Sequence, residues 1–431
     1  MFEAIRLVMR RTLTMANLFE NLAETFGDRE AVLEEKPPGY RLFPSSRITF
    51  YDCIRFTNLA AETFIRDLDL KKGERVAFYG LEPMEQFVVA VAVIKAGGIV
   101  VPMRPGSDDV EMRERIRGCG AELAVVDAGA LTRRPDVVEC MPGVRRITTP
   151  GPSAGLPRGV HSLQEAVSRS SGFFIPYTLK PSNVVCLFHE VMEDGSTKAV
   201  MVTNQGLLGP HRAAALLFPH RGGDTAVCAF PPQAAGGFLA AALALAMGLR
   251  LCLIPDAKSE LILEACVKHS PTVFMGTTEA YSGLLEAGAS GNDLRSVNLW
   301  FAAGTDMPRD VMDTFRGLGS MRLGSLRMPA PFVQSFDAGG NATMLALKTP
   351  RPFTPRPENV TGPALPPNRM RVVDDSGRRV KRGEEGELVI KGPAVTPGYW
   401  NDLEGSLAAK RDGWLYTGIY ARRNRFSITL R

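Results

Sequence analysis

The chain has 431 residues, of which 45% are hydrophobic and 23% are charged. These values are typical of a folded globular protein, and the length exceeds one compact core, so we expect two or three subdomains. The net charge of +5 comes from basic residues scattered along the chain, which argues against a nucleic-acid partner.

The first 16 residues are expected to form a leading helix. Their start, MFEAIRLVMRRTL, is basic and amphipathic, and such a helix can lie on a membrane surface or on another protein through residues 1–13. The simpler interpretation is a short helix that packs on its own domain. No transmembrane segment is expected, because the most apolar stretch, FLAAALALAMGLRLCLIP, is interrupted by Arg250 and Pro255.

Residues 17–182 alternate between strand and helix patterns, which predicts a first α/β subdomain with a parallel sheet and right-handed crossovers. The strand candidates are short apolar runs, and the helix candidates show helical periodicity and end in glycine. The expected strands are RVAFYG, IVVPM and ELAVVD, and the expected helices between them are PMEQFVVAVAVIKAGG and DDVEMRERIRGCGA.

A second α/β subdomain is expected over residues 183–345. Its strand candidates are NVVCLF, TAVCAF, LRLCLI, PTVFMG and VNLWFAAG, with helices at 237–248 and 258–269. Residues 346–431 change to Pro-rich segments and to period-two alternation around the turns DDSG and RGEEG. The predicted fold class is therefore α/β, with two parallel-sheet subdomains and a small distorted β-barrel.

The cysteines and histidines carry no metal or disulfide signature. The seven cysteines form no C-x-x-C pair, and the five histidines lack the spacing of metal ligands. We interpret the cysteines as buried thiols of a protein in a reducing compartment.

Four stretches resemble the large N-terminal domain of the adenylate-forming superfamily, which includes acyl-CoA synthetases, luciferases and peptide-synthetase adenylation domains. They are NLFENLAETFGDREAVL at 17–33, the segment ITFYDC to VPMRP at 48–105, the segment RMRVVDDSG to GYWND at 369–402, and DGWLYTG at 412–418. The resemblance implies that ATP and a carboxylate form an acyl-adenylate, that coenzyme A takes the acyl group, and that the protein is cytoplasmic. The family's small C-terminal domain, with its catalytic lysine, is not expected within a chain that ends at Arg431.

The phosphate-binding loop of the family, T-S-G-T-T-G-x-P-K-G, corresponds to EVMEDGSTKA at 190–199. Only Gly195 and Lys198 match, and Glu193 and Asp194 stand where two hydroxyl donors belong. Carboxylates accept hydrogen bonds and repel phosphate, by roughly 4 kcal/mol for a like-charge pair about 4 Å apart at an effective dielectric near 20. The alternative interpretation is an ordinary hairpin turn centred on Asp-Gly.

The magnesium motif, Y-G-x-T-E, is placed on SLRMP at 325–329, where Met328 and Pro329 replace the Thr and the Glu. Neither side chain binds a hard cation. Upstream, Gly304 and Thr305 of AAGTDMP retain the shape of the adenine-contacting turn. An ordinary strand-to-helix turn explains that match equally well.

The ribose motif, D-G-W-x-x-T-G-D, keeps Thr417 and Gly418 but has Ile419 in place of the final Asp. An Ile side chain cannot accept a hydrogen bond, which should cost about 1.5–3 kcal/mol of ribose binding. Arg431 matches the arginine that precedes the family's domain hinge and would contact ribose.

On the acyl side, Ala234 lies where the family often has His. Ala234, Gly236 and Gly237 are candidate substrate-binding residues, because small side chains leave an open channel. Close packing of the helix explains the same small residues equally well.

These losses all affect nucleotide binding, whereas the scaffold stretches match well. The first hypothesis is therefore a non-catalytic protein that binds an acyl or other carboxylate ligand, or a partner protein, with no metal and no cofactor. The alternative is an active or weakly active carboxylate–CoA ligase that uses ATP, Mg²⁺ and coenzyme A, with Lys198 as its phosphate ligand, completed by a C-terminal domain in trans.

Overall fold

The computed structural model describes residues 5–431 except 8, 11, 35–46, 105–106, 153, 193–194, 210–222, 232–233, 255–257, 305, 324, 339, 349–358 and 426. Its helices are η1 (Met15–Asn17), α2 (Leu18–Phe26), α3 (Phe50–Arg66), α4 (Pro83–Lys95), α5 (Asp109–Cys119), α6 (Ala128–Arg133), η2 (Pro135–Cys140), α7 (Leu163–Val167), α9 (Ala235–Ala246), α10 (Ser259–His269), α11 (Thr278–Glu286), α12 (Gly291–Leu294), α13 (Arg309–Leu318) and α14 (Leu403–Ala408).

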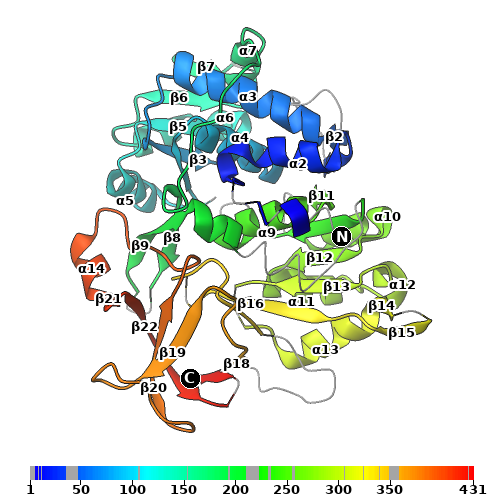
Figure 1. Ribbon diagram of the computed structural model, residues 1–431. Coiled ribbons are helices and arrows are strands. Elements are labelled where there is room, and N and C mark those ends of the chain that lie inside the picture. Colours follow the sequence, from blue (N-terminus) through cyan, green and yellow to red (C-terminus); the bar gives the residue numbers. More distant parts are fainter. Residues whose placement is uncertain are drawn as a thin grey trace.

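The first sheet has seven strands and is parallel except at its last pair (Figure 1). In sheet order the strands are β7 (Val160–Ser162), β6 (Arg146–Thr149), β5 (Leu123–Val126), β3 (Arg75–Tyr79), β4 (Ile99–Pro102), β8 (Val184–Val191) and β9 (Thr197–Thr203). The central strands are buried along their length, as expected for short apolar runs covered on both faces.

The second sheet has eight strands and is mostly parallel, with antiparallel pairs at both edges. In sheet order the strands are β17 (Ala346–Lys348), β16 (Phe332–Phe336), β13 (Leu299–Ala302), β12 (Val273–Gly276), β10 (Thr225–Ala229), β11 (Arg250–Leu253), β1 (Glu30–Glu34) and β2 (Arg47–Thr49). The α/β class predicted from the alternating pattern is confirmed.

The strands of the two sheets are not divided at residue 183, where the second subdomain was expected to begin. The hairpin of β8 and β9 extends the first sheet, whereas β1 and β2 complete the second. Val100 of β4 pairs with Cys186 of β8, and Val32 of β1 pairs with Leu251 of β11. An apolar strand pairs with whichever edge the topology offers, so local patterns detect the strands without assigning them to a sheet.

The third region is a six-stranded antiparallel sheet near the C-terminus, drawn orange to red in Figure 1. Its path runs from β18 (Val360–Thr361) through β23 (Ile428–Leu430), β22 (Trp414–Arg423) and β20 (Glu385–Lys391) to β19 (Arg369–Val373), and β21 (Lys410–Arg411) pairs with β22. The predicted hairpin around DDSG and RGEEG is the β19–β20 pair. A separate two-stranded hairpin joins β14 (Ser320–Leu323) and β15 (Leu326–Pro329).

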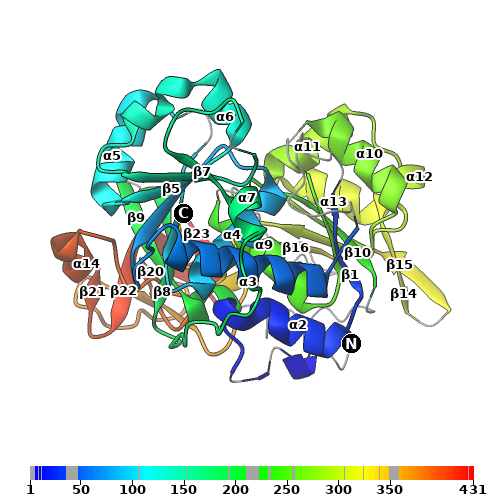
Figure 2. The ribbon, with the colours of Figure 1, turned by 90° about the horizontal axis from the view of Figure 1, so that it is seen from above.

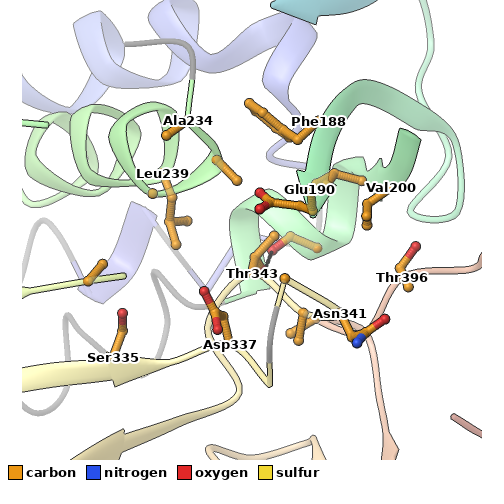
Figure 3. A pocket seen from close by; sticks show the side chains of 18 of the residues that line it. Phe188, Glu190, Val200, Ala234, Leu239, Ser335, Asp337, Asn341, Thr343 and Thr396 are labelled. Carbon is orange, nitrogen blue, oxygen red and sulfur yellow. Dashed lines mark hydrogen bonds between the residues drawn. The ribbon is translucent and has the colours of Figure 1, made fainter. Parts of the chain in front are cut away.

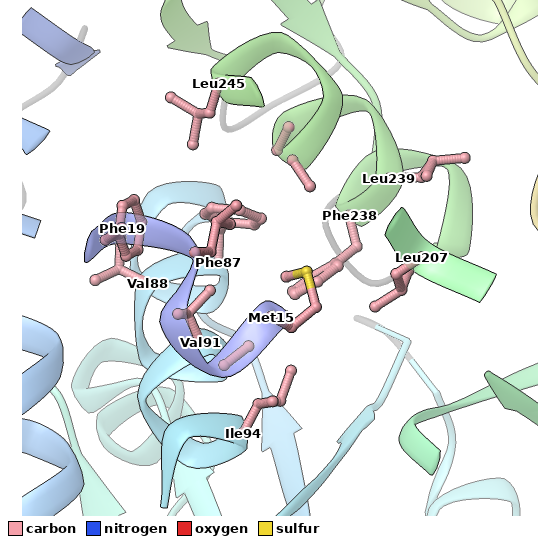
Figure 4. Close-up of a cluster of buried hydrophobic side chains, with 14 of the residues drawn as sticks. Met15, Phe19, Phe87, Val88, Val91, Ile94, Leu207, Phe238, Leu239 and Leu245 are labelled. Atoms are coloured by element: carbon pink, nitrogen blue, oxygen red, sulfur yellow. The ribbon is translucent and has the colours of Figure 1, made fainter. Parts of the chain in front are cut away.

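The main core lies where α4 of the first unit meets α9 of the second (Figures 2 and 4). All thirteen residues of α4 are buried, which explains why its pattern is apolar on every face. Phe87 of α4 and Phe238 of α9 have ring centroids 5.0 Å apart, and Phe19 of α2 meets Phe87 edge-on at 6.3 Å. This packing fixes the two units against each other and thereby positions the site between them.

Part of the predicted leading helix is described. Residues 5–7 are helical, and Leu7 and Leu13 are buried in the core. These side chains pack on the protein, as the simpler interpretation expects; Phe2 and Val8 lie outside the described residues. Within the described ranges, the helices are too short or too polar to cross a membrane.

Candidate functional site

The segment that resembles a phosphate loop forms a tight hairpin between β8 and β9. Val191 pairs with Thr197, the Met192 amide donates to the Ser196 carbonyl at 2.8 Å, and the Gly195 amide donates to the Met192 carbonyl at 2.9 Å. Gly195 has φ +78°, a left-handed conformation that glycine adopts without strain. The described residues on either side of 193–194 are therefore hydrogen-bonded as in a β-hairpin; Glu193 and Asp194 lie outside the described residues.

Lys198, the cation expected to contact phosphate, is held by protein groups. Its Nζ lies 3.1 Å from Asp402 Oδ2 and 4.6 Å from the centre of the Tyr399 ring. Lys198 is the cross-strand partner of Glu190, yet its ammonium group turns to Asp402. The Lys198 charge is thus paired away from the cavity described next.

A cavity of about 190 Å³ lies between the β8–β9 hairpin, the start of α9 and the carboxyl ends of β10, β13 and β16 (Figure 3). Ligands of open α/β sheets bind at this edge of the strands. Of the candidate residues, Ala234, Gly236 and Gly304 line the cavity. Thr305 lies outside the described residues.

Gly237 is required by packing. A Cβ atom on Gly237 would lie 2.3 Å from the Pro231 carbonyl oxygen, which no side chain tolerates. At this residue the structure favours the close-packing alternative, whereas Ala234 and Gly236 border open space.

Two carboxylates give the cavity its charge. Among its described lining residues, the charged side chains are Glu190 from β8 and Asp337 from the loop after β16. Figure 3 shows them converging on the same space from different sheets. Burial raises the pKa of Glu190 to about 7, with a further contribution from the Asp337 charge that is partly offset by Arg115. Glu190 is therefore about half protonated at neutral pH.

The same environment shifts the pKa of the neighbouring His189 in the opposite direction. Burial lowers its pKa to about 4, and the positive charge of Arg115 adds to that shift. At neutral pH the His189 imidazole is uncharged and brings no cation to the carboxylates. The region thus disfavours charge on both residues.

Glu190 occupies space that a side chain at position 340 would need. A Cβ on Gly340 would lie 2.9 Å from Glu190 Cγ, and Gly340 has φ +78°. A residue with a side chain is therefore disfavoured at position 340, both by the close contact with Glu190 and by the positive φ.

Several polar side chains in the wall of the cavity form hydrogen bonds with other protein groups. Thr343 Oγ1 donates to the Gly206 carbonyl at 2.6 Å, Thr396 Oγ1 donates to the Met201 carbonyl at 2.8 Å, and the Tyr399 hydroxyl donates to Asn341 Oδ1 at 2.9 Å. These bonds fix the wall and leave the carboxylates as its principal electrostatic feature.

The predicted position of the magnesium motif is wrong. Residues 326–329 form β15, whose side chains are mostly exposed, and they do not line the cavity. The strand that reaches the cavity is β16, and the run that follows it, 336–340, reads Phe-Asp-Ala-Gly-Gly. The local pattern of a strand and a turn occurs twice here, and only the pairing of β16 with β13 distinguishes the two.

Neither run contains a Thr-Glu pair. In the described part of the chain, no group of three or more His, Cys, Asp or Glu side chains is arranged to hold a metal ion. The runs 325–329 and 336–340 thus lack the Thr-Glu pair that the resemblance implies for the magnesium motif.

The residues expected to contact ribose and to precede the hinge bond or pack to protein groups of the C-terminal sheet. The Thr417 hydroxyl donates to the Leu388 carbonyl at 2.8 Å, and the Gly418 amide donates to Glu387 Oε1 at 2.9 Å. Ile419 packs against the apolar core of this region, and Arg431 forms an ion pair with Glu385. These four residues do not line the cavity, so their ligand roles stay predictions.

Asp337, Asn341 and Thr343 also line the cavity, and they belong to none of the sequence motifs described above. The sequence does contain a signal for them, because polar residues follow the strand pattern FVQSF within a few positions. In a parallel sheet such residues meet at the carboxyl edge.

The fold and the position of the cavity define an α/β protein with an acyl-CoA synthetase-like N-terminal domain. The sequence profile described as "AMP-binding enzyme" matches residues 19–400, and the chain belongs to this family. It is 23% identical over 435 residues to a long-chain-fatty-acid–CoA ligase of Bacillus subtilis, covering 94% of this chain and 74% of the relative. It is 22% identical over 396 residues to an indoleacetate–CoA ligase of Aromatoleum aromaticum, covering 91% and 74%.

Solved structures share the fold. A long-chain-fatty-acid–CoA ligase from Archaeoglobus fulgidus superposes with a TM-score of 0.82 at 20% identity, covering 97% of this chain and 84% of that one. An anthranilate–CoA ligase in complex with anthranoyl-AMP gives a TM-score of 0.81 at 16% identity, covering 98% and 77%. At such identities the likeness establishes the fold and leaves the activity open.

Proposed function

We propose that the chain is a non-adenylating member of the AMP-binding enzyme family that binds a small acyl-type molecule in the acid-walled cavity. The observation that carries this proposal is the charge of the cavity. Among the described residues that line it, the charged ones are Glu190 and Asp337, while Lys198 is paired with Asp402. A triphosphate in this space would lie beside the Glu190 and Asp337 carboxylates, which repel it when they are ionised. No metal and no nucleotide cofactor are part of the proposal.

The ligand is expected to be small and to have a largely apolar body. The cavity volume of about 190 Å³ is below the roughly 300–1,000 Å³ of drug-sized ligand sites. Phe188, Leu239 and Phe301 supply apolar walls. A short acyl group fits these walls, and its head group would lie near the two carboxylates.

The head group decides the pH dependence of binding. An ionised ligand carboxylate can bind beside Glu190 only while Glu190 is protonated and donates its hydrogen. With a Glu190 pKa of about 7, the protonated fraction falls about tenfold between pH 6 and pH 8, and the affinity for a carboxylate should fall equally. An uncharged amide of the same chain should bind equally well at both pH values.

Calorimetric titration with hexanoate and with hexanamide tests the ligand class. We expect hexanoate binding to weaken about tenfold from pH 6 to pH 8, hexanamide binding to stay constant, and Glu190→Gln to remove the pH dependence. Absence of binding of both compounds to the wild-type chain would refute an acyl ligand of this size. Glu404→Gln, which makes the same change at an exposed residue that does not line the cavity, is the control.

Pyrophosphate–ATP exchange with a panel of carboxylates tests the loss of adenylation. Exchange above background would exclude the non-catalytic proposal and favour the second candidate, a carboxylate–CoA ligase that uses ATP, Mg²⁺ and coenzyme A. Relatives named as CoA ligases support that candidate. In it Lys198 would leave Asp402 to contact phosphate, so Lys198→Ala should abolish the exchange.

A further inference from the structure

A second concave surface is lined by other residues than the cavity, and its charged side chains are basic instead of acidic. It is a groove of about 460 Å³ between edge strand β19, the segment 362–364 after β18, and the turn that joins β22 to β23. Five arginine side chains line it: Arg369, Arg371, Arg379, Arg423 and Arg425. We call it the arginine groove. None of its described lining residues is Asp or Glu.

The arginine groove lies in the part of the chain that carries the net charge. Residues 359–431 contain 13 Lys and Arg against 8 Asp and Glu, an excess of +5 that equals the net charge of the whole chain. The residues before 359 are therefore balanced overall. The net positive charge of the chain therefore lies in the same segment as the arginine groove.

Two of the five arginines are held in place by the protein. The Arg371 guanidinium stacks 4.4 Å from the centre of the Trp414 ring, and Arg423 Nη1 donates to the Val380 carbonyl at 2.7 Å. Stacking orients a guanidinium plane while leaving its N–H donors at the edge available. The groove is thus partly preorganised.

Arg369 and Arg379 are exposed and form no ion pair with the described acidic residues. By contrast, the nearby Arg422 and Arg431 are both paired with Glu385. Arginine stays protonated at every physiological pH, so the charges in the groove cannot be relieved by losing a proton. An anion that bridges them would remove this repulsion.

We propose that the arginine groove binds a small ligand with two or three linked phosphate groups. Linked phosphates present several oxygens at spacings that planar guanidinium forks bind in pairs. The volume of about 460 Å³ lies within the range of small-molecule sites. The site is independent of the acid-walled cavity, so the proposal holds whether or not the chain adenylates a carboxylate.

Titration with inorganic tripolyphosphate at constant ionic strength is the test. We expect saturable binding with a stoichiometry near one, and orthophosphate to bind at least about tenfold more weakly. The double variant Arg369→Gln/Arg379→Gln should lose about tenfold or more in affinity. The control Arg378→Gln/Arg382→Gln removes the same charge from exposed residues that do not line the groove and should keep the wild-type affinity.

Two results would overturn the proposal. One is the absence of tripolyphosphate binding to the folded wild-type chain. The other is an equal loss of affinity in the groove variant and the control, which would indicate nonspecific attraction to net charge. Co-sedimentation with phosphatidylserine vesicles, in the absence of tripolyphosphate binding, would assign the groove to a membrane surface instead. Because ATP also carries linked phosphates, its binding is compared between the wild type and the groove variant.

Discussion

The buried carboxyl of Glu190 makes the stability of this protein depend on pH in a way that can be isolated. Replacing Glu190 by Gln keeps the shape of the side chain and removes its ionisation. The pKa of Glu190 rises from the ordinary 4.5 to about 7 in the folded chain, so the folded state binds this proton more tightly than the unfolded state does. Wild-type stability from this residue is therefore complete below pH 4.5, falls as the pH rises to 7, and is constant above.

The magnitude follows from the shift. The rise of the Glu190 pKa from 4.5 to about 7 corresponds to at most about 3.4 kcal/mol, at 1.36 kcal/mol for each pKa unit. At pH 8 the Glu190→Gln variant should exceed the wild type in free energy of unfolding by up to that amount, and at pH 4.5 the two should agree. His189 acts with the opposite sign, since its pKa is lowered to about 4; its contribution rises from pH 4 to 6.5 and cancels in the difference between variant and wild type.

Urea unfolding followed by tryptophan fluorescence, at half-unit intervals from pH 4.5 to 8.5, gives that difference directly. Asp337→Asn is the matched variant, because removing its charge takes away one cause of the raised Glu190 pKa and should reduce the pH dependence. A constant difference between wild type and Glu190→Gln over the whole range would show that the Glu190 carboxyl is hydrated and ionised at neutral pH, and would remove the basis of the pH dependence proposed for carboxylate binding.

Three further outcomes are expected. Gly340→Ala should destabilise the chain by about 1–3 kcal/mol, because Cβ would meet Glu190 Cγ at 2.9 Å with φ +78°; a Glu190→Ala background should recover part of this in a double-mutant cycle. Ile419→Asp should lower the free energy of unfolding by about 1–3 kcal/mol, since it places a charge against the apolar core of the C-terminal sheet. Pyrophosphate–ATP exchange by the Ile419→Asp variant would contradict the proposal that the chain does not adenylate. All seven cysteines are unpaired and buried, so Ellman's reagent should titrate them only after unfolding in urea, and fast labelling of the native chain would contradict the assignment.

The sequence by itself determined the order of the elements and the class of the fold. Short apolar runs such as RVAFYG and ELAVVD indicate strands, and the periodicity of PMEQFVVAVAVIK indicates the helix that follows the first of them. The complete burial of α4 is a finding of the structure. The departures from the family pattern at Ile419 and at residues 193–194 are also visible in the sequence, and their effect on nucleotide binding stays a prediction.

Tertiary structure alone decided the site. Glu190 belongs to β8 in the first sheet and Asp337 follows β16 in the second, and no local pattern brings residues of two sheets together. The same holds for Lys198, whose partner Asp402 comes from the C-terminal region, and for the magnesium motif, whose position depends on which strand pairs with β13. Local sequence governs propensity and burial pattern, whereas pairing across the chain and the pKa that burial imposes depend on the assembled packing.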